Sequence, residues 1–239
     1  MDVIQPTTSV IHALLTGGVS NLANLVAAIG ALGGASMGLV DTTKMFRGGP
    51  SNIGFGHIED GLAPFLDAIA SNASPFGKHA ILRTLKGDWL NGAAKPDQKA
   101  KAKSLIQQSL SQANATALAN VAAVDANVLQ SAVQKKADGG QATAGETGAL
   151  AQFESVLTAV IDEAYERGDQ KYRNAAKSLA MVTSIVLSEV AGMSIWGVTQ
   201  ENLAFFLVTG LIATPLAPIA KDVASALQTA ATAASAVKK

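Results

Sequence analysis

The longest stretch without a charged side chain places the strongest constraint on how this chain folds. Residues 3–40 contain no Asp, Glu, Lys or Arg, a run of 38 residues. About 20 apolar residues are enough to cross the hydrocarbon core of a bilayer. Gly17 and Gly18 interrupt the run. We therefore expect one spanning helix at residues 22–40, preceded by an interfacial or re-entrant segment.

Two further apolar stretches lie near the C-terminus. Residues 178–200 contain one charged residue, Glu189, and residues 202–220 contain none. A helix over the nineteen residues 178–196 or 202–220 is about 29 Å long, close to the thickness of the hydrocarbon core. The segment between them, "GVTQE" (197–201), is so short that it predicts a helical hairpin.

Residues at the ends of these stretches suit a membrane–water interface. Lys177 precedes the first stretch and Trp196 lies near its end, and basic and aromatic residues are both typical of that boundary. Pro215 and Pro218 lie late in the second stretch. They predict a kink or a frayed end in that helix.

The composition agrees with this interpretation. The chain is 49% hydrophobic and only 15% charged, whereas about 25% is usual in soluble domains. Its formal net charge is zero, so no overall field favours nucleic acid as a partner. It has no cysteine, which excludes disulfides and thiol chemistry. We predict an all-α membrane protein with three transmembrane helices and a helical cytoplasmic region. The alternative is a soluble, alanine-rich helical protein in which the apolar runs are core helices.

The basic residues predict the topology. Of the 18 Lys and Arg residues, 15 lie between Asp41 and Lys177, and the other three follow the third apolar stretch. The positive-inside rule then places the central region and the C-terminus in the cytoplasm and the N-terminus outside. The predicted parts are an N-terminal piece with the first span (1–44), a helical cytoplasmic region (45–176), and a transmembrane hairpin with a cytoplasmic tail (177–239).

The beginning of the central region combines a glycine-rich segment with an amphipathic one. Residues 46–61, rich in glycine, are predicted to form a loop. Residues 78–92 are amphipathic and basic and include Trp89. This segment either lies flat on the lipid headgroups, with Trp89 at the interface, or packs on neighbouring helices.

The rest of the central region has helical periodicity. Residues 100–136 repeat apolar side chains at spacings of three and four, and Asp125 is a plausible N-cap that divides them. Residues 137–148 are expected to form a flexible link. From there we predict one continuous helix over 149–196, with Gly168 as its weak point.

Small residues recur along the first span. Gly30, Gly34 and Gly38 are four residues apart, and Ala27 and Ala31 belong to a second thin row beside them. Such a pattern lets helix backbones approach closely in lipid. Three partners are open: the hairpin of the same chain, the same span of a second copy, or another protein.

Glu189 is the sharpest polar candidate. It lies twelve residues beyond Lys177, about 18 Å along a helix. An ionised carboxylate at that depth costs several kcal/mol, so we expect Glu189 to be protonated, paired or facing water. It would carry protons or cations, or would form a structural hydrogen bond to a neighbouring backbone carbonyl, Ser188 or Thr183.

The catalytic and metal-binding signals are weak. Residues 34–38 match the G-x-S-x-G pattern at Ser36, but a hydrolase places this serine on a strand-to-helix turn. The three histidines have no metal-ligand spacing and no phosphate-binding motif is present. We predict no enzyme, no metal and no cofactor.

Two segments carry a resemblance to other proteins: "GALGGASMGLVDTTKMF" (30–46) and "AYERGDQKYRNAAKSLAMVTSIVLSEVAG" (164–192). Their layout resembles that of uncharacterised bacterial inner-membrane proteins with one early span, a helical cytoplasmic region and a C-terminal hairpin. The resemblance implies a location in the bacterial plasma membrane. The expected function is a structural or interaction subunit, self-associating through the first span, whose partners are the lipid bilayer and a second copy or another membrane protein. The alternatives are a small channel or ion-coupled transport component that uses Glu189, and a membrane hydrolase.

Overall fold

The protein is all-helical in the parts that its structure, a computed structural model, describes. These are residues 26–43, 49–69 and 77–237, with the side chains of Trp196, Glu201 and 220–237 left undescribed. No strand occurs within these ranges, so the predicted all-α class is confirmed. The expected interfacial segment before the first span lies outside them.

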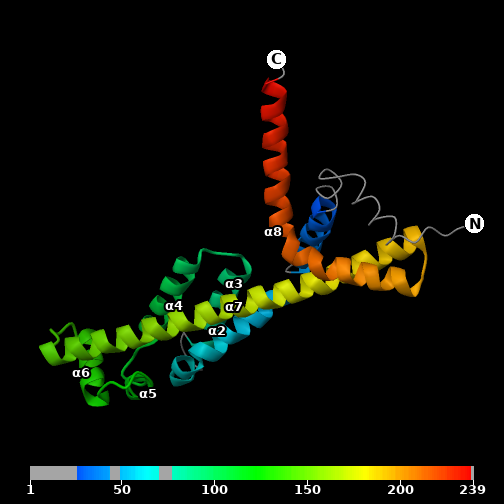
Figure 1. Ribbon diagram of the computed structural model, residues 1–239. Helices are drawn as coiled ribbons and strands as arrows, with labels where there is room; N and C mark the ends of the chain where they lie inside the picture. The colour runs from blue at the N-terminus through cyan, green and yellow to red at the C-terminus, as the bar shows by residue number, and fades with distance from the viewer. Residues whose placement is uncertain (1–25, 44–48, 70–76, 238–239) are drawn as a thin grey trace, which may run out of the picture. The chain divides into compact units, whose positions relative to one another are not determined.

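Two helices are long and apolar enough to cross a membrane by length and composition. They are α7 (Ala144–Trp196) and the segment Asn202–Ile219 of α8 (Gln200–Val237), and a shorter apolar helix covers Val26–Thr42. The chain forms two compact units (Figure 1). We call residues 47–173 the central unit, and the described residues within 1–46 and 174–239 the terminal unit.

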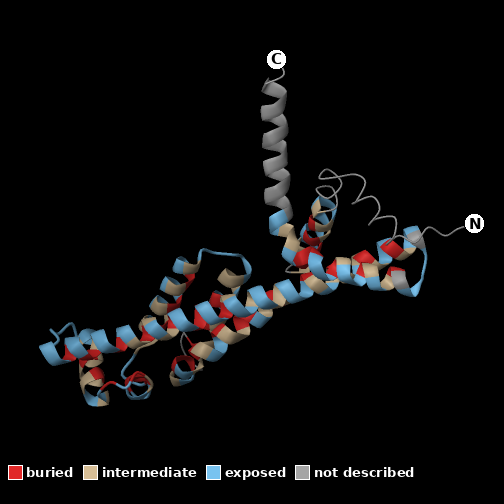
Figure 2. Cartoon of the chain, viewed as in Figure 1, coloured by how far each residue is buried: buried red, intermediate tan, exposed pale blue. Residues whose placement is uncertain are grey.

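The central unit has a core of large apolar and aromatic side chains. It contains α2 (Gly49–Ala68), α3 (Lys78–Leu90), α4 (Lys95–Ser109), α5 (Ala115–Val121), α6 (Ala126–Ala137) and the first part of α7. Phe65 of α2 packs edge-on against Phe153 of α7, with ring centroids 6.0 Å apart. Tyr165 and Leu157 of α7 are also fully buried. Figure 2 shows that buried positions recur along the helices of this unit. This is the burial pattern that water imposes on an ordinary domain.

The loop predicted over residues 46–61 is wrong, because residues 49–61 belong to α2. Two of their glycines, Gly54 and Gly61, pack closely against α7. A Cβ atom at Gly54 would lie 2.8 Å from the carbonyl oxygen of Gly168, and one at Gly61 would lie 2.7 Å from the Cβ atom of Ala164. Contact with α7 therefore outweighs the low helix propensity of glycine here.

The helical segment predicted over residues 100–136 is broken twice, and α4, α5 and α6 share it. Asn114 stabilises the first break, since its side chain accepts a hydrogen bond from the Ser111 amide and donates one to the Ser109 carbonyl. The second break precedes Asp125, whose carboxylate accepts hydrogen bonds from the amides of Asn127 and Val128 at 2.9 and 3.0 Å. The predicted N-cap is confirmed.

The long helix predicted over 149–196 is confirmed and begins slightly earlier, at Ala144. Its start is a capping box within the segment expected to be a flexible link. The Thr143 amide donates to the Glu146 carboxylate at 2.7 Å, and the Glu146 amide donates to the Thr143 hydroxyl at 3.3 Å.

The terminal unit contains the helix Val26–Thr42, the last part of α7, and α8. A tight turn joins α7 to α8, in which Gly197 has a φ of +80°, a conformation that glycine adopts without strain. The predicted helical hairpin is present. Pro215 and Pro218 lie inside α8, which bends and continues to Val237 (Figure 1), so they do not end the helix.

Candidate functional site

The two helices of the hairpin meet along rows of residues spaced by four. We call these rows the hairpin seam: Ala180, Ser184, Ser188 and Gly192 on α7, and Asn202, Phe206, Gly210 and Thr214 on α8, all of them buried. A Cβ atom at Gly192 would overlap the Phe206 ring, and one at Gly210 would overlap the backbone of Ile185. The helices therefore approach as closely as their small residues allow.

A hydroxyl group links the two helices at the centre of the hairpin seam. Ser184 Oγ lies 2.6 Å from the carbonyl oxygen of Gly210, to which it donates, and 3.3 Å from Thr214 Oγ1. Ser184 is fully buried and Thr214 nearly so. The Ser184 hydroxyl is thus turned inward and satisfied between the two helices.

The opposite face of α7 carries large apolar side chains that contact little. Val182, Val186 and Val190 are 58, 54 and 55% exposed. They lie two residues from members of the hairpin seam, a rotation of about 200° around the helix. Among the described residues, every exposed large apolar side chain except Ile53 and Leu90 belongs to the terminal unit.

The helix Val26–Thr42 packs on α8 through a glycine that the sequence analysis did not single out. A Cβ atom at Gly33 would overlap the backbone of Ala213, and Gly30, on the same face, is also buried. In contrast, Gly34 and Gly38 are exposed, and a Cβ atom at either would have no neighbour within 4 Å in the part of the chain that the structure describes. Of the predicted small-residue row, only Gly30 is buried.

The alanines predicted beside the glycine row share this exposed side. Ala27 and Ala31 are both exposed. Ser36 is buried in the middle of the helix, and its hydroxyl donates to the Leu32 carbonyl at 2.8 Å. It therefore lacks the strand-to-helix turn that a hydrolase nucleophile requires.

Glu189 lies beside the hairpin seam in the terminal unit and is half-buried. Its Oε2 atom is buried and has no hydrogen-bond partner among the described residues. A buried carboxylate oxygen without a partner is unusual in proteins.

The three residues predicted at an interface lie in different surroundings. Lys177 is exposed, and Trp196 ends α7 with a side chain that the structure does not describe. Trp89 is half-buried in the central unit, where its indole N–H donates to the Ser51 carbonyl at 2.9 Å. Its ring also packs edge-on against Tyr165 and Tyr172.

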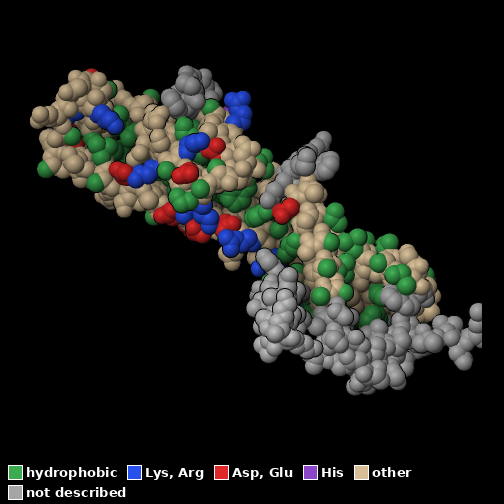
Figure 3. Space-filling view, turned by 90° about the horizontal axis from the view of Figure 1, so that it is seen from above, with side chains coloured by type: hydrophobic (Ala, Val, Ile, Leu, Met, Phe, Trp, Pro, Cys, Tyr) green, Lys and Arg blue, Asp and Glu red, His purple; other side chains and the backbone are tan. Residues whose placement is uncertain are grey.

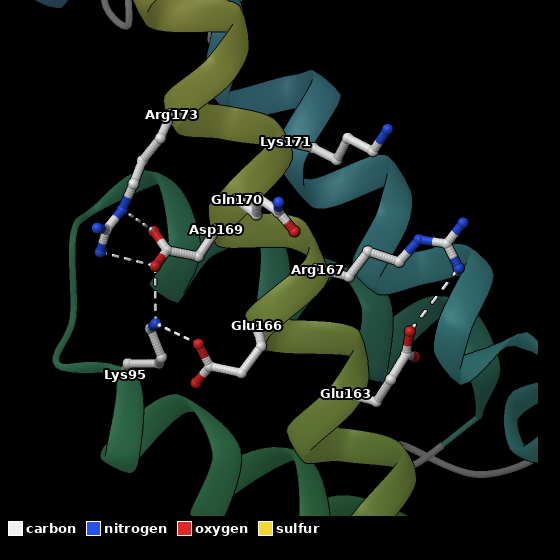
Figure 4. A pocket seen from close by; sticks show the side chains of 8 residues that line it. All are labelled: Lys95, Glu163, Glu166, Arg167, Asp169, Gln170, Lys171 and Arg173. Atoms are coloured by element: carbon white, nitrogen blue, oxygen red, sulfur yellow. Dashed lines mark hydrogen bonds and ion pairs between the residues drawn. The ribbon is translucent and has the colours of Figure 1, made fainter.

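A second candidate is a charged groove on the central unit, where α4 meets α7 (Figures 3 and 4). Lys95 Nζ lies 2.7 Å from Asp169 and 3.1 Å from Glu166, and Lys99 Nζ lies 3.0 Å from Glu166. These hydrogen bonds raise the pKa of Lys95, chiefly through Asp169, and lower that of Glu166, chiefly through Lys99. Most of the charged side chains in the groove are paired with one another. The ion pairs of Lys95 and Lys99 with α7 join α4 to this helix.

Neither metal-ligating groups nor comparison with known proteins assigns a function to these residues. No group of three or more metal-ligating side chains occurs among the described residues. Comparison with known protein families, curated proteins and solved structures finds no match.

Neither the hairpin seam nor the charged groove was predicted from the sequence. The seam has a readable signal, because Ala180, Ser184, Ser188 and Gly192 recur every four residues just as the glycines of the first span do. The ion pairs between α4 and α7 join residues about 70 positions apart. No local pattern reveals such a pairing.

Proposed function

We propose that this chain is an integral protein of the bacterial inner membrane and acts there as a structural or interaction subunit. The three spans that we propose lie within residues 22–40, 178–196 and 202–220. The observation that carries the proposal is the burial pattern of the terminal unit: the hairpin seam buries Ser184, Ser188 and Thr214, whereas large valine, leucine and isoleucine side chains of the unit are exposed. Water opposes that arrangement, whereas acyl chains accept it.

The central unit supports the same proposal by contrast. It has an apolar core and carries its charges on the surface (Figure 3), as a domain in water does. We place it, together with the C-terminus, in the cytoplasm, and the N-terminus outside. The basic residues flanking the spans, among them Lys177 and Lys221, favour this orientation.

The surface that the first span offers to a partner is its exposed face of small residues. Gly34, Gly38, Ala27 and Ala31 leave this face open, while Gly33 on the other side packs against α8 within the chain. We propose that a second copy of the chain covers the exposed face, since two such faces bring backbones close enough for strong dispersion contacts.

Replacing Gly34 tests self-association. Because a Cβ atom at Gly34 has no neighbour within 4 Å among the described residues, Gly34→Leu should retain the helical content but shift the detergent-solubilised protein from dimer to monomer, as measured by light scattering. Gly33→Leu is the matched control, because it should disrupt packing on α8 and lower the thermal stability instead. An unchanged particle mass for Gly34→Leu would contradict self-association through this face.

Membrane insertion is tested separately. We expect the chain to remain in the membrane fraction after alkaline extraction and to aggregate when detergent is removed. A monomeric protein that stays soluble in plain buffer would contradict the proposal, and with it the three spans.

A second candidate function rests on Glu189, whose buried Oε2 atom has no partner among the described residues. In this case the chain passes protons or cations through the membrane along a polar path that includes this carboxyl group. Glu189→Gln should then reduce proton or cation flux into vesicles at least tenfold, while Glu59→Gln, at an exposed position of α2, should not. Equal flux in wild-type and empty vesicles would exclude the transport function.

A further inference from the structure

The basic residues of α7 are clustered in one segment beside its apolar stretch. All four of its basic residues lie between Arg167 and Lys177, whereas its acidic residues other than Glu189 lie between Glu146 and Asp169. The basic segment ends where the apolar stretch begins, at Ser178. Because α7 is one continuous helix, this segment lies within about 17 Å of that stretch along the helix axis.

The basic side chains also form two like-charged pairs. Arg167 and Lys171 are four residues apart, as are Arg173 and Lys177. Residues at this spacing are neighbours on the helix surface, and equal charges there destabilise the helix. An anion lying across each pair removes that repulsion.

Carboxylates of the chain satisfy only part of this positive charge. Arg173 pairs with Asp169 at 2.9 Å, but Asp169 is shared with Lys95 at 2.7 Å, so one carboxylate serves two cations. Arg167 reaches Glu163 only at 3.7 Å.

Lys171 and Lys177 are exposed and form no ion pair with any residue that the structure describes. Figure 4 shows that Lys171 extends from the other side of α7 than the Lys95 cluster. A surplus of positive charge therefore remains next to the apolar stretch.

We propose that this basic segment, consisting of Arg167, Lys171, Arg173 and Lys177, binds the phosphate headgroups of anionic phospholipids. The inference rests on the proposed membrane insertion. Charge complementarity selects the occupant, since anionic lipids of the cytoplasmic leaflet attract basic side chains beside a spanning helix. The segment thereby anchors α7 at the membrane surface and selects the lipids around the hairpin.

The test uses the full chain, which has no cysteine of its own. Asn174→Cys, at an exposed position within the segment, carries a fluorophore in vesicles of phosphatidylcholine mixed with an equal part of phosphatidylglycerol. Quenching by brominated forms of each lipid measures which headgroup is enriched beside α7. We expect phosphatidylglycerol to be preferred, and Lys171→Gln or Lys177→Gln each to reduce the preference up to about fivefold.

Lys136→Gln is the matched control, because Lys136 is exposed on α6 and also forms no ion pair with a described residue. It should leave the lipid preference unchanged, and circular dichroism should show all variants equally helical. Equal quenching by the two lipids, or the same loss with Lys136→Gln, would overturn the inference while leaving membrane insertion intact. An absence of quenching by either lipid would contradict insertion itself, and the inference with it.

Discussion

The Glu146 carboxylate joins three parts of the central unit at the start of α7. It accepts hydrogen bonds from the Lys135 ammonium group, the Ser131 hydroxyl and the Thr143 amide. These bonds, that of Lys135 first, lower the pKa of Glu146 from 4.5 to about 2. One side chain thus caps α7 and attaches it to α6.

This lowered pKa predicts how stability depends on pH. Because folding favours the charged form, the contribution of Glu146 is complete above its ordinary pKa and is lost as the pH falls from about 5 towards 2. Glu146→Gln should therefore unfold at a lower urea concentration than the wild type at neutral pH, and the difference should disappear near pH 2. Circular dichroism measures both midpoints, with the exposed Glu59→Gln as the control. A difference independent of pH would contradict this role.

At the scale of single residues, the interactions that could be predicted from the sequence are those between near neighbours in the chain. The Asp125 cap was predicted from the sequence because its hydrogen bonds are to the next turn of the same helix. The same kind of signal was present in Thr143 and Glu146, three residues apart, yet the neighbouring glycines favoured a flexible link. The pairing of Glu146 with Lys135 depends on how two helices are packed, which no local pattern contains.

At the scale of elements, glycines of one helix have opposite effects according to what surrounds them. On α7, a Cβ atom at Gly168 would lie 2.6 Å from the Ile58 side chain and 2.8 Å from the Gly54 carbonyl oxygen, whereas one at Gly148 would have no neighbour within 4 Å. Intrinsic propensity favours alanine over glycine in a helix by about 1 kcal/mol. Overpacking at a tight contact costs about 1–3 kcal/mol.

The two substitutions should therefore change stability in opposite directions. Gly148→Ala should stabilise the protein by about 0.5–1 kcal/mol, and Gly168→Ala should destabilise it by about 1 kcal/mol because α2 has to move away from α7. Urea unfolding followed by circular dichroism measures both. If Gly168→Ala were also stabilising, α2 and α7 would not approach closely at this point.

The long helices were the elements that the sequence predicted best. The extent of α7 follows from a long stretch with helical periodicity, and its hairpin with α8 follows from two long apolar stretches. Few other folds can accommodate such stretches. The helix α2 was predicted as a loop because its glycines were read as turn residues, although their role appears only when α7 packs against them. In the same way, Gly33 is the glycine of the helix Val26–Thr42 that packs on α8. The position of α8 decides which of several neighbouring small residues is buried.

At the scale of the whole molecule, the two units follow opposite rules of burial. The central unit hides side chains such as Phe65, Leu66 and Phe153 and exposes charges, whereas the terminal unit hides Ser184 and Ser188 and exposes apolar side chains. Composition alone averages the two parts into a mean hydropathy of +0.27, which describes neither of them.

This division predicts that the two units differ in their need for detergent. A fragment covering residues 47–173 retains the apolar core of the central unit and, among the described residues, exposes only Ile53 and Leu90 of the large apolar side chains. It should be a helical monomer in plain buffer and should unfold cooperatively in urea, because burial of its core drives folding in water. The full chain should sediment as a discrete species only in detergent, because its exposed valines, leucines and isoleucines otherwise associate. Sedimentation velocity with and without detergent measures both proteins, and a fragment that aggregated while the full chain stayed dispersed would show that the apolar surface had been assigned to the wrong unit.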